Sequence, residues 1–394
     1  MKMRKLVLAA VMVASVVALS GAAAAQKAPA VSVDLGSEAR VKALFSWPNT
    51  CADVSVCGGP SPEETVRHYL SQSLARDGYA DSGVTVRRGG SGYQAVFTGS
   101  AARSYPAAIT AFLKAGDLAL ADARRIAAAK TPDGKSQWPY SWRFFLPVGL
   151  AMVNNPTVEL LHFPPDYSLT DKQDYLNSAT TNRWAGLLAV NGVPADRTDA
   201  YQAIIDINPI AAPASDGGKL ADVEGVFSDY IITMLGNWTA DRAAPGRGKP
   251  MVAFGSPVRE WLSKLLGRTL NVDEVALLTL PGGAVVPVIG ANHPSQIFYT
   301  AWNDTTPKTE NFQKGMQVMT QDLIAACWQA RMGRTPGADP QAAAADCTRQ
   351  WTADSAQACT LLETTIYGKS PEQAQAVCSS LPPTILAESA ALAP

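Results

Sequence analysis

An asparagine–histidine pair directly follows an apolar run of the length of a buried β-strand. Residues 285–289 are apolar, Gly290 and Ala291 follow them, and Asn292 and His293 come next. Open α/β folds keep their ligand sites at the carboxyl ends of the sheet strands, so this spacing predicts that the pair lies at such an edge. A histidine there can donate a hydrogen bond to an oxygen that gains negative charge in a transition state.

Two other expected strands also end in polar side chains. Asp166 and Tyr167 follow a strand at residues 158–163, and Asn208 follows a strand at residues 203–207. If these strands are parallel neighbours, their ends meet at one edge of the sheet. Asp166 can position or deprotonate a water molecule, and the amide of Asn208 can both donate and accept hydrogen bonds. Together with the histidine they form a candidate hydrolytic site.

The alternative interpretation of this edge is structural. Asn292 and His293 would then cap their strand and bond to neighbouring backbone groups. Other chemistries lack their motifs, because the sequence has no GxSxG nucleophile motif, no HExxH zinc motif and no phosphate-binding P-loop. We therefore expect neither a metal ion nor a cofactor.

The region around these residues alternates between strands and helices. This alternation predicts an α/β fold, with a three-layer α/β/α domain around a mainly parallel sheet. Ser256 is the expected cap of one helix, with Pro257 at its first position, and residues 281–283 form a turn between two strands. That pair of strands is either a hairpin or includes a strand added at the edge of the sheet. The expected elements are helices at 184–190, 220–235 and 256–266 and strands at 251–254, 275–280 and 285–289.

Helical regions are expected on both sides of this domain. Ser61 and Glu64 form a capping-box pattern, and residues 106–130 have apolar side chains at helical spacing, with a weak strand pattern at 93–98 between them. The end of the chain has helical patterns throughout, with another capping box at Ser370. The expected divisions are a signal peptide (1–25), a mostly helical N-terminal region (26–150), the α/β domain (151–305) and a disulfide-braced helical tail (306–394).

Six cysteines suggest a disulfide framework, since an even number in an oxidising compartment favours pairing. Cys51 and Cys57 are close enough in sequence to close a small loop. The other four allow three pairings, of which we favour the two that join successive helices. A zinc site is the alternative, but no CxxC motif or histidine accompanies these residues. The favoured pairs are Cys327 with Cys347 and Cys359 with Cys378.

The first residues have the pattern of a secretory signal peptide. Lys2, Arg4 and Lys5 precede an apolar segment at 6–19, and small residues at 23–25 fit a cleavage site. No later apolar run is long enough to span a bilayer, so we expect a periplasmic or secreted protein. Cleavage would remove three of the 33 basic residues and none of the 34 acidic ones. The remaining charge is not that of a tight nucleic-acid binder, which needs clustered Lys and Arg.

Residues 158–300 resemble the uracil-DNA glycosylase superfamily. Four segments carry the resemblance: residues 180–188, the strand that ends at Asn208, the strand–glycine–helix unit at 252–266, and the tripeptide His293-Pro294-Ser295 after the last strand. The resemblance implies a small parallel sheet between helices. It also implies hydrolysis of the bond between uracil and deoxyribose, after the base has been flipped out of the stack.

The resemblance further implies roles for individual residues. His293 would stabilise the leaving uracil, Asn208 would recognise it and Asp166 would hold the attacking water. Either Tyr167 or Phe163 would stack on the base. The remaining substrate contacts would come from Asn292 and Ser295.

Two functions from different classes are consistent with this sequence. The first is an enzyme that cleaves an N-glycosidic bond in a nucleoside or nucleic acid. The second is a non-catalytic periplasmic binding or envelope-associated module on the same scaffold. A basic groove next to His293 would favour the first function, whereas a closed or apolar edge with Asp166 turned away would favour the second. The sequence identifies no protein partner.

Overall fold

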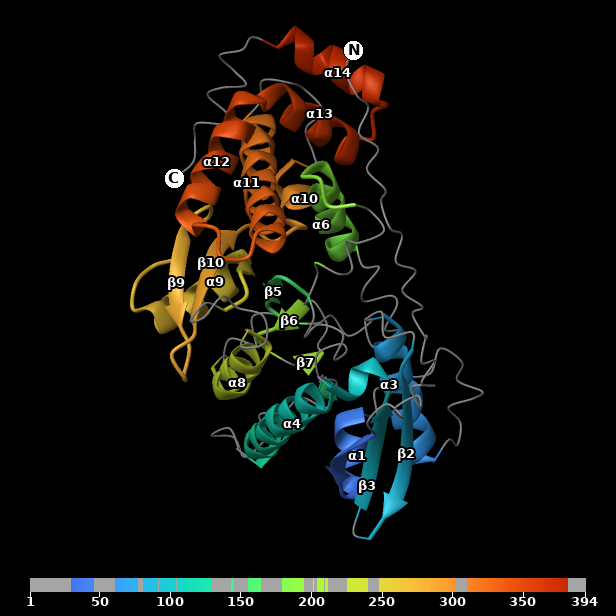
Figure 1. The fold of residues 1–394 in the computed structure, drawn as a ribbon. Coiled ribbons are helices and arrows are strands. Elements are labelled where there is room, and N and C mark those ends of the chain that lie inside the picture. Colours follow the sequence, from blue (N-terminus) through green and yellow to red (C-terminus); the bar gives the residue numbers. More distant parts are fainter. Residues whose placement is uncertain are drawn as a thin grey trace, which may run out of the picture.

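The chain has a central five-stranded sheet between helices, flanked by an N-terminal unit and a helical C-terminal region (Figure 1). The computed structural model describes residues 30–45, 61–76, 81–90, 92–103, 105–128, 143–144, 155–163, 179–194, 201, 204–208, 210–211, 225–239, 248–301 and 310–381. The expected signal peptide, the Cys51–Cys57 pair, and Asp166 with Tyr167 lie outside these residues. None of the helices within them is both long and apolar enough to cross a bilayer.

The central sheet is mainly parallel. Its strand order is β6-β5-β8-β10-β9, in which β6, β5, β8 and β10 run parallel and β9 is antiparallel to β10. All four residues of β5 and of β8 are buried, as expected for strands covered on both faces. The strands are β5 (Val158–Leu161), β6 (Ile204–Asp206), β8 (Met251–Phe254), β9 (Val275–Thr279) and β10 (Val285–Ala291).

Helices cover both faces of this sheet, which confirms the predicted three-layer α/β/α architecture. Helix α9 (Gly255–Leu266) packs on one face against β8 and β10. On the other face lie α11 (Glu310–Arg334) and α6 (Ala179–Val190), which contact each other and the sheet. There the indole ring of Trp184 meets the ring of Phe254 edge-on, with centroids 4.6 Å apart.

The last two sheet strands form a hairpin at the edge. Val285 pairs with Thr279, and the turn between the strands contains Gly282 and Gly283, both with positive φ. The backbone N–H of Leu280 donates to the carbonyl of Ala284 across this turn. Both possibilities considered from the sequence are therefore present, because β9 forms a hairpin with β10 and is also the edge strand of the sheet.

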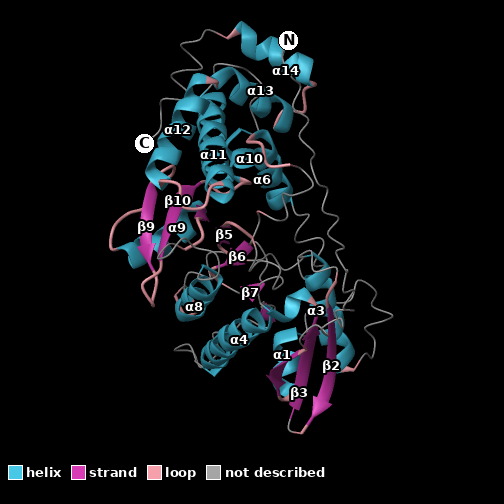
Figure 2. Ribbon diagram, in the orientation of Figure 1, coloured by secondary structure: helices cyan, strands magenta, loops and turns pink. Residues whose placement is uncertain are grey.

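The N-terminal unit is mostly helical, with a small antiparallel sheet in the order β1-β3-β2 (Figure 2). The predicted capping box is present, because Glu64 N–H donates to Ser61 Oγ and Ser61 N–H donates to the Glu64 carboxylate. Strands β1 and β2 had not been predicted. The elements are β1 (Val31–Gly36), α1 (Glu38–Phe45), α3 (Pro62–Arg76), β2 (Gly83–Gly89), β3 (Gly92–Thr98), η1 (Ser100–Arg103) and α4 (Tyr105–Ala128).

The C-terminal helices are joined by two disulfides, which confirms the favoured pairings. Cys327 is bonded to Cys347, and Cys359 is bonded to Cys378. The predicted capping box at Ser370 is also present. Helix α11, which the sequence divisions place in the tail, covers the central sheet. The other C-terminal helices are α12 (Pro340–Ala353), α13 (Ser355–Thr365) and α14 (Pro371–Ser380).

Two helix starts differ from the sequence prediction. Helix α8 (Ser228–Thr239) begins at Ser228 and not at residue 220, because the residues just before it form a turn through Gly225 with positive φ. The N-cap of α9 is Phe254 and not Ser256, since the chain passes from β8 into the helix at once. The remaining elements are β4 (Arg143–Phe144), β7 (Ile210–Ala211) and α10 (Gln296–Ala301).

The first disulfide should contribute strongly to the stability of the central domain. It ties α12 to α11, the helix that covers the sheet, and it closes a loop with a sequence separation of 20 residues. Replacing Cys327 and Cys347 by alanine should lower the free energy of unfolding by about 2–4 kcal/mol, measured by urea denaturation under oxidising conditions. The Cys359/Cys378 double variant should leave the unfolding of the central sheet less affected. Equal losses in both variants would contradict this assignment.

Candidate functional site at the carboxyl edge of the sheet

The carboxyl ends of the four parallel strands form a single edge of the sheet. The direction in which successive strands are added reverses in the middle of this edge, between β5 and β8. From β5 the chain proceeds to β6 on one side, whereas β8 and β10 lie on the other side. Such a switch point opens a crevice beyond the strand ends, where α/β folds bind ligands. The residues that follow these strands are His162 and Phe163 after β5, Asn208 two residues after β6, Gly255 after β8, and Asn292 and His293 after β10.

His293 is a half-buried histidine held in its neutral form. Burial is the largest cause that lowers its pKa, to about 4, and the nearby His162 and Arg183 lower it further. Its Nδ1 accepts a hydrogen bond from the backbone N–H of Ser295 at 3.2 Å. Because Nδ1 is an acceptor, the single proton of the neutral ring lies on Nε2. His293 can therefore donate one hydrogen bond, through Nε2.

Gly255 allows the start of α9 to approach His293. Its φ of +79° lies in the left-handed region that favours glycine. A Cβ atom at this position would lie 3.4 Å from the Cβ of His293. The glycine predicted from the strand–glycine–helix unit thus supports the turn and leaves space beside the histidine.

Asn208 is fully buried, yet its side-chain amide has no hydrogen-bond partner among the described residues. Its exposed fraction is 0%, and neither Oδ1 nor Nδ2 makes a hydrogen bond within the part of the chain that the structure describes. Its backbone is held, because its N–H donates to the carbonyl of His162 at 3.0 Å. A buried amide without hydrogen bonds lowers the stability of the fold. Such an amide is consistent with a residue that forms its hydrogen bonds with a bound ligand.

His162 interacts with both Asn208 and His293. No role for His162 had been predicted from the sequence. Its carbonyl receives the Asn208 N–H, while its ring acts electrostatically on His293. Burial lowers the pKa of His162 to about 4, so it too is neutral near pH 7. Its ring meets the half-buried Phe163 edge-on at 5.1 Å. Its position at the end of an apolar strand was the signal that could have identified it.

A buried ion pair lies behind His293. Arg183 on α6 and Asp322 on α11 approach to 3.5 Å, with side-chain exposures of 5% and 0%. Burial raises the pKa of Asp322 well above its usual range, whereas Arg183 and a hydrogen bond with Asn292 oppose this shift. The guanidinium of Arg183 also lies over the ring of Phe298, 5.1 Å from its centroid. Asp322 was missed because its helix had been assigned to the tail.

Two predicted substrate-binding residues form hydrogen bonds within the protein. Asn292 Nδ2 donates to Gln321 Oε1 at 2.9 Å, and Ser295 Oγ lies 2.9 Å from Thr180 Oγ1. These contacts fix the segment that carries His293 to helices α11 and α6. Asn292 and Ser295 therefore position the histidine in this structure.

The structure brings together part of the predicted site. Asn208, Phe163 and His293 all follow strands at the same edge, whereas Asp166 and Tyr167 lie outside the described residues. Within the described ranges, no group of three or more His, Cys, Asp or Glu side chains could hold a metal ion. Along this edge the described residues thus provide a neutral hydrogen-bond donor, an amide that no other described residue satisfies, and a half-buried aromatic ring.

Replacing Asn208 by leucine should stabilise the protein. The side chains are similar in shape, and the substitution removes a buried amide that no described residue satisfies. We expect the free energy of unfolding to rise by about 1–3 kcal/mol in chemical denaturation at pH 7.5. Asn191, a buried amide that donates to Leu187 O, is the matched control, and its replacement by leucine should destabilise the chain. A loss of stability in the Asn208→Leu variant would show that this amide has partners in the folded chain.

His293 should make stability depend on pH in a defined window. The ordinary histidine pKa is 6.5, and burial lowers it to about 4 in the folded chain. Between these values the unfolded chain binds a proton here that the folded chain does not, so stability falls as the pH falls from 6.5 toward 4. In His293→Gln the slope in this window should decrease by about 1.4 kcal/mol per pH unit, measured by urea unfolding at several pH values. A slope equal to that of the wild type would contradict burial of a neutral imidazole.

Comparison with known proteins adds no relative to this description. No protein-family model matches the chain, and no curated protein matches it either. Because one fold can host many functions, the function has to be argued from the residues of the site.

Proposed function

We propose that this chain is a uracil-DNA glycosylase-like hydrolase that cleaves an N-glycosidic bond in a nucleoside or nucleic acid. The proposal is carried by two residues at one sheet edge: a neutral His293 that donates through Nε2, and a buried Asn208 whose amide has no hydrogen-bond partner among the described residues. A nucleobase carries hydrogen-bonding groups that could satisfy both side chains. Its amide-like edge can satisfy both ends of the asparagine, and its carbonyl oxygen can accept from the histidine.

The proposed reaction breaks the bond between the base and the sugar carbon. The bonding electron pair leaves with the base, whose carbonyl oxygen gains negative charge, and water adds to the sugar carbon. His293 Nε2–H would stabilise that charge. A neutral donor placed in advance gains strength in a site that excludes water, and no protein reorganisation is needed when the charge develops. Phe163 would contact the face of the base.

The water-activating residue in this proposal is Asp166, with Tyr167 as a second stacking candidate. Asp166 would accept a proton from the attacking water as its oxygen bonds to the sugar carbon. Both residues belong to the segment that follows β5, the strand that also leads to His162 and Phe163. The proposal thus places the water on the side of β5 and the leaving base between β5 and β10.

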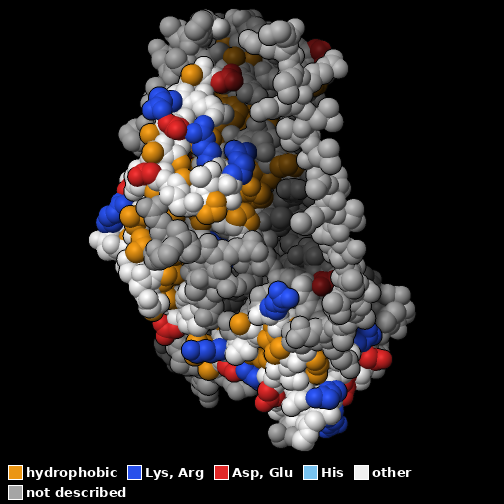
Figure 3. Space-filling view, in the orientation of Figure 1, with side chains coloured by type: hydrophobic (Ala, Val, Ile, Leu, Met, Phe, Trp, Pro, Cys, Tyr) orange, Lys and Arg blue, Asp and Glu red, His pale blue; other side chains and the backbone are white. Residues whose placement is uncertain are grey.

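A specific observation favours a second function, which is non-catalytic binding of a small ligand on the same scaffold. Arg183, the basic residue whose charge acts on His293, is buried against Asp322 and does not face outward. A nucleic-acid strand is held mainly by exposed Lys and Arg, and the described residues on the face in Figure 3 intersperse both signs of charge. A nucleoside or free base fits this electrostatic setting better than a long strand does.

Export through the expected signal peptide is part of the same proposal. The bonds Cys327–Cys347 and Cys359–Cys378 support it, because disulfides persist mainly in oxidising compartments. An exported enzyme would meet nucleosides or nucleic acid outside the cytoplasm.

Base release tests the proposed function. The mature, oxidised protein is incubated with deoxyuridine and with uracil-containing single- and double-stranded DNA, and free uracil is quantified. We expect release that falls about 10²–10³-fold in His293→Ala, the loss typical of removing one donor to a developing oxyanion. Replacement of His68, on α3 of the N-terminal unit, is the matched histidine control.

The outcomes of this assay separate the two functions. Equal release in the wild type and in His293→Ala would remove His293 from the mechanism. No release from any substrate would contradict the hydrolase. Uracil binding that depends on Asn208, measured by calorimetry, would then support the non-catalytic module.

A further inference from the structure

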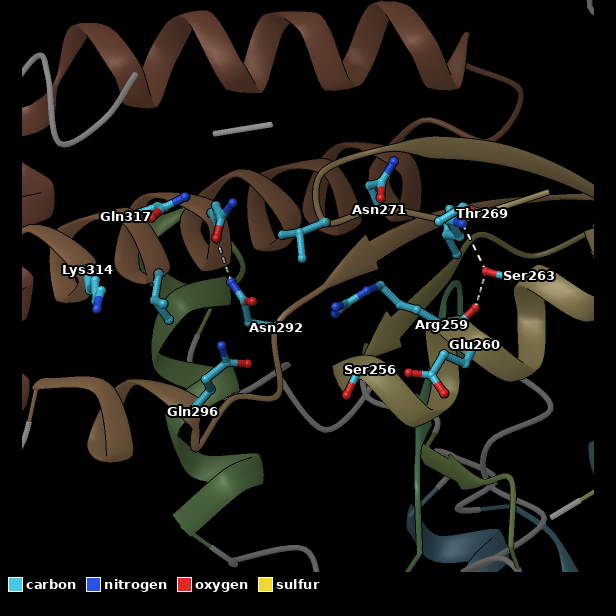
Figure 4. Close-up of a pocket in the computed structure, with 14 residues that line it drawn as sticks. Ser256, Arg259, Glu260, Ser263, Thr269, Asn271, Asn292, Gln296, Lys314 and Gln317 are labelled. Atoms are coloured by element: carbon cyan, nitrogen blue, oxygen red, sulfur yellow. Dashed lines mark hydrogen bonds between the residues drawn. The ribbon is translucent and has the colours of Figure 1, made fainter. Parts of the chain in front are cut away.

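A polar cavity lies beside the candidate site and has no role in the proposed reaction. It has a volume of about 560 Å³ and is formed by α9, the loop before β9, the segment that joins β10 to α10, and the N-terminal half of α11. Its lining includes Asn292 but not His293 (Figure 4). The volume falls in the range of small-molecule sites.

Arg259 is the central cation of this cavity. Its side chain extends from α9 toward Asn292 (Figure 4), and its Nη1 donates to the carbonyl of Ala291 at 2.7 Å. Among the described residues this is the one hydrogen bond of the guanidinium, which has five N–H donors in total. The remaining donors are available to a bound group. Planar forks of this kind match phosphate and carboxylate oxygens.

The backbone around Arg259 is shaped to admit it. A Cβ atom on Gly290 would lie 2.0 Å from the carbonyl oxygen of Asn271 and 3.0 Å from Cδ of Arg259. Glycine at this position of β10 therefore allows the loop and the arginine to approach the strand closely. The result is a half-buried guanidinium fixed between a strand and a loop.

The charges around the cavity favour an anion. The lining has two basic side chains, Arg259 and Lys314, and one acidic side chain, Glu260. Asp273 also acts on Arg259, and burial raises the pKa of the Asp273 carboxyl well above its usual range, which Arg259 opposes. Ser256 lies at the N-terminal end of α9, where the helix dipole adds positive potential.

We propose that this cavity binds the phosphate or carboxylate group of a small polar molecule, with Arg259 as its anchor. The amide side chains in the lining would contact the polar body of the ligand, since each amide both donates and accepts. They come from Asn271, Asn292, Gln296, Gln317 and Gln321. The site does not depend on the proposed hydrolysis, because His293 and Asn208 do not line it.

Oxyanion titration of the full mature chain tests this site. Inorganic phosphate and acetate are titrated in separate arms against sodium chloride at matched ionic strength, and binding is followed by calorimetry and by the midpoint of thermal unfolding. We expect at least one of the two oxyanions to bind and raise the midpoint beyond chloride. The arm that responds identifies the group that the cavity prefers.

Variants on one helix supply the control. Arg259→Gln should weaken oxyanion binding at least about tenfold, because it removes a charge and its hydrogen bonds. Lys264→Gln removes the same charge from an exposed position of α9 outside the cavity and should bind as the wild type does. If Arg259→Gln does not fold, Lys314→Gln on α11 should weaken binding by a smaller factor.

Two results would overturn the proposal. The first is an oxyanion affinity in the lining variants equal to that of the wild type, and the second is no response to either oxyanion beyond chloride. Neither result decides whether uracil is released, because that assay depends on His293, which does not line this cavity. Failure of the oxyanion site and failure of the proposed hydrolase are therefore distinguishable.

Discussion

The hydrogen bonds of the buried Gln329 fix the arrangement on which the candidate site depends. Its Oε1 accepts from the indole of Trp184 on α6 at 2.6 Å, and its Nε2 donates to Thr157 and Glu159 at 2.9 and 2.8 Å. One side chain on α11 thereby sets the position of α6 and of the strand β5. Two turns earlier on α11, Gln321 and Asp322 reach Asn292 and Arg183. The position and surroundings of His293 therefore depend on how α11 is aligned along the sheet.

The site combines a fully hydrogen-bonded buried side chain, Gln329, with a buried amide that lowers stability, that of Asn208. Buried polar contacts are worth most when every member is paired, and those of Gln329 meet that condition. Asn208, at the same sheet edge, has no hydrogen-bond partner for either end of its amide within the described ranges. Proteins tolerate such conflicts mainly where binding or catalysis needs them, and stability comes from elsewhere in the fold. Here the helices on both faces and the disulfide between α11 and α12 supply that support.

Local patterns predicted the elements well, but they could not reveal contacts between distant segments. Alternation of apolar strands with helices predicted the parallel sheet. The four C-terminal cysteines allowed three pairings, and the favoured one, which joins successive helices, is present. Asn208 and His293 could be placed at one edge because parallel strands end together. Asp322 could not be placed there, because the sequence of its helix does not indicate which surface of the protein the helix covers. The cavity around Arg259 could not be predicted either, because Gly290 and Asn271 come together beside this arginine only in the folded chain.

The protonation state of His293 tests the central claim most directly. The chain has three histidines, so ¹⁵N NMR of the imidazole nitrogens gives a simple spectrum, and His293→Gln identifies the relevant signals. The structure predicts that at pH 6 the ring of His293 is neutral, with the proton on Nε2 and none on Nδ1. Free uracil should then perturb the Nε2–H signal. A ring that is doubly protonated at pH 6, or one that carries its proton on Nδ1, would contradict the account.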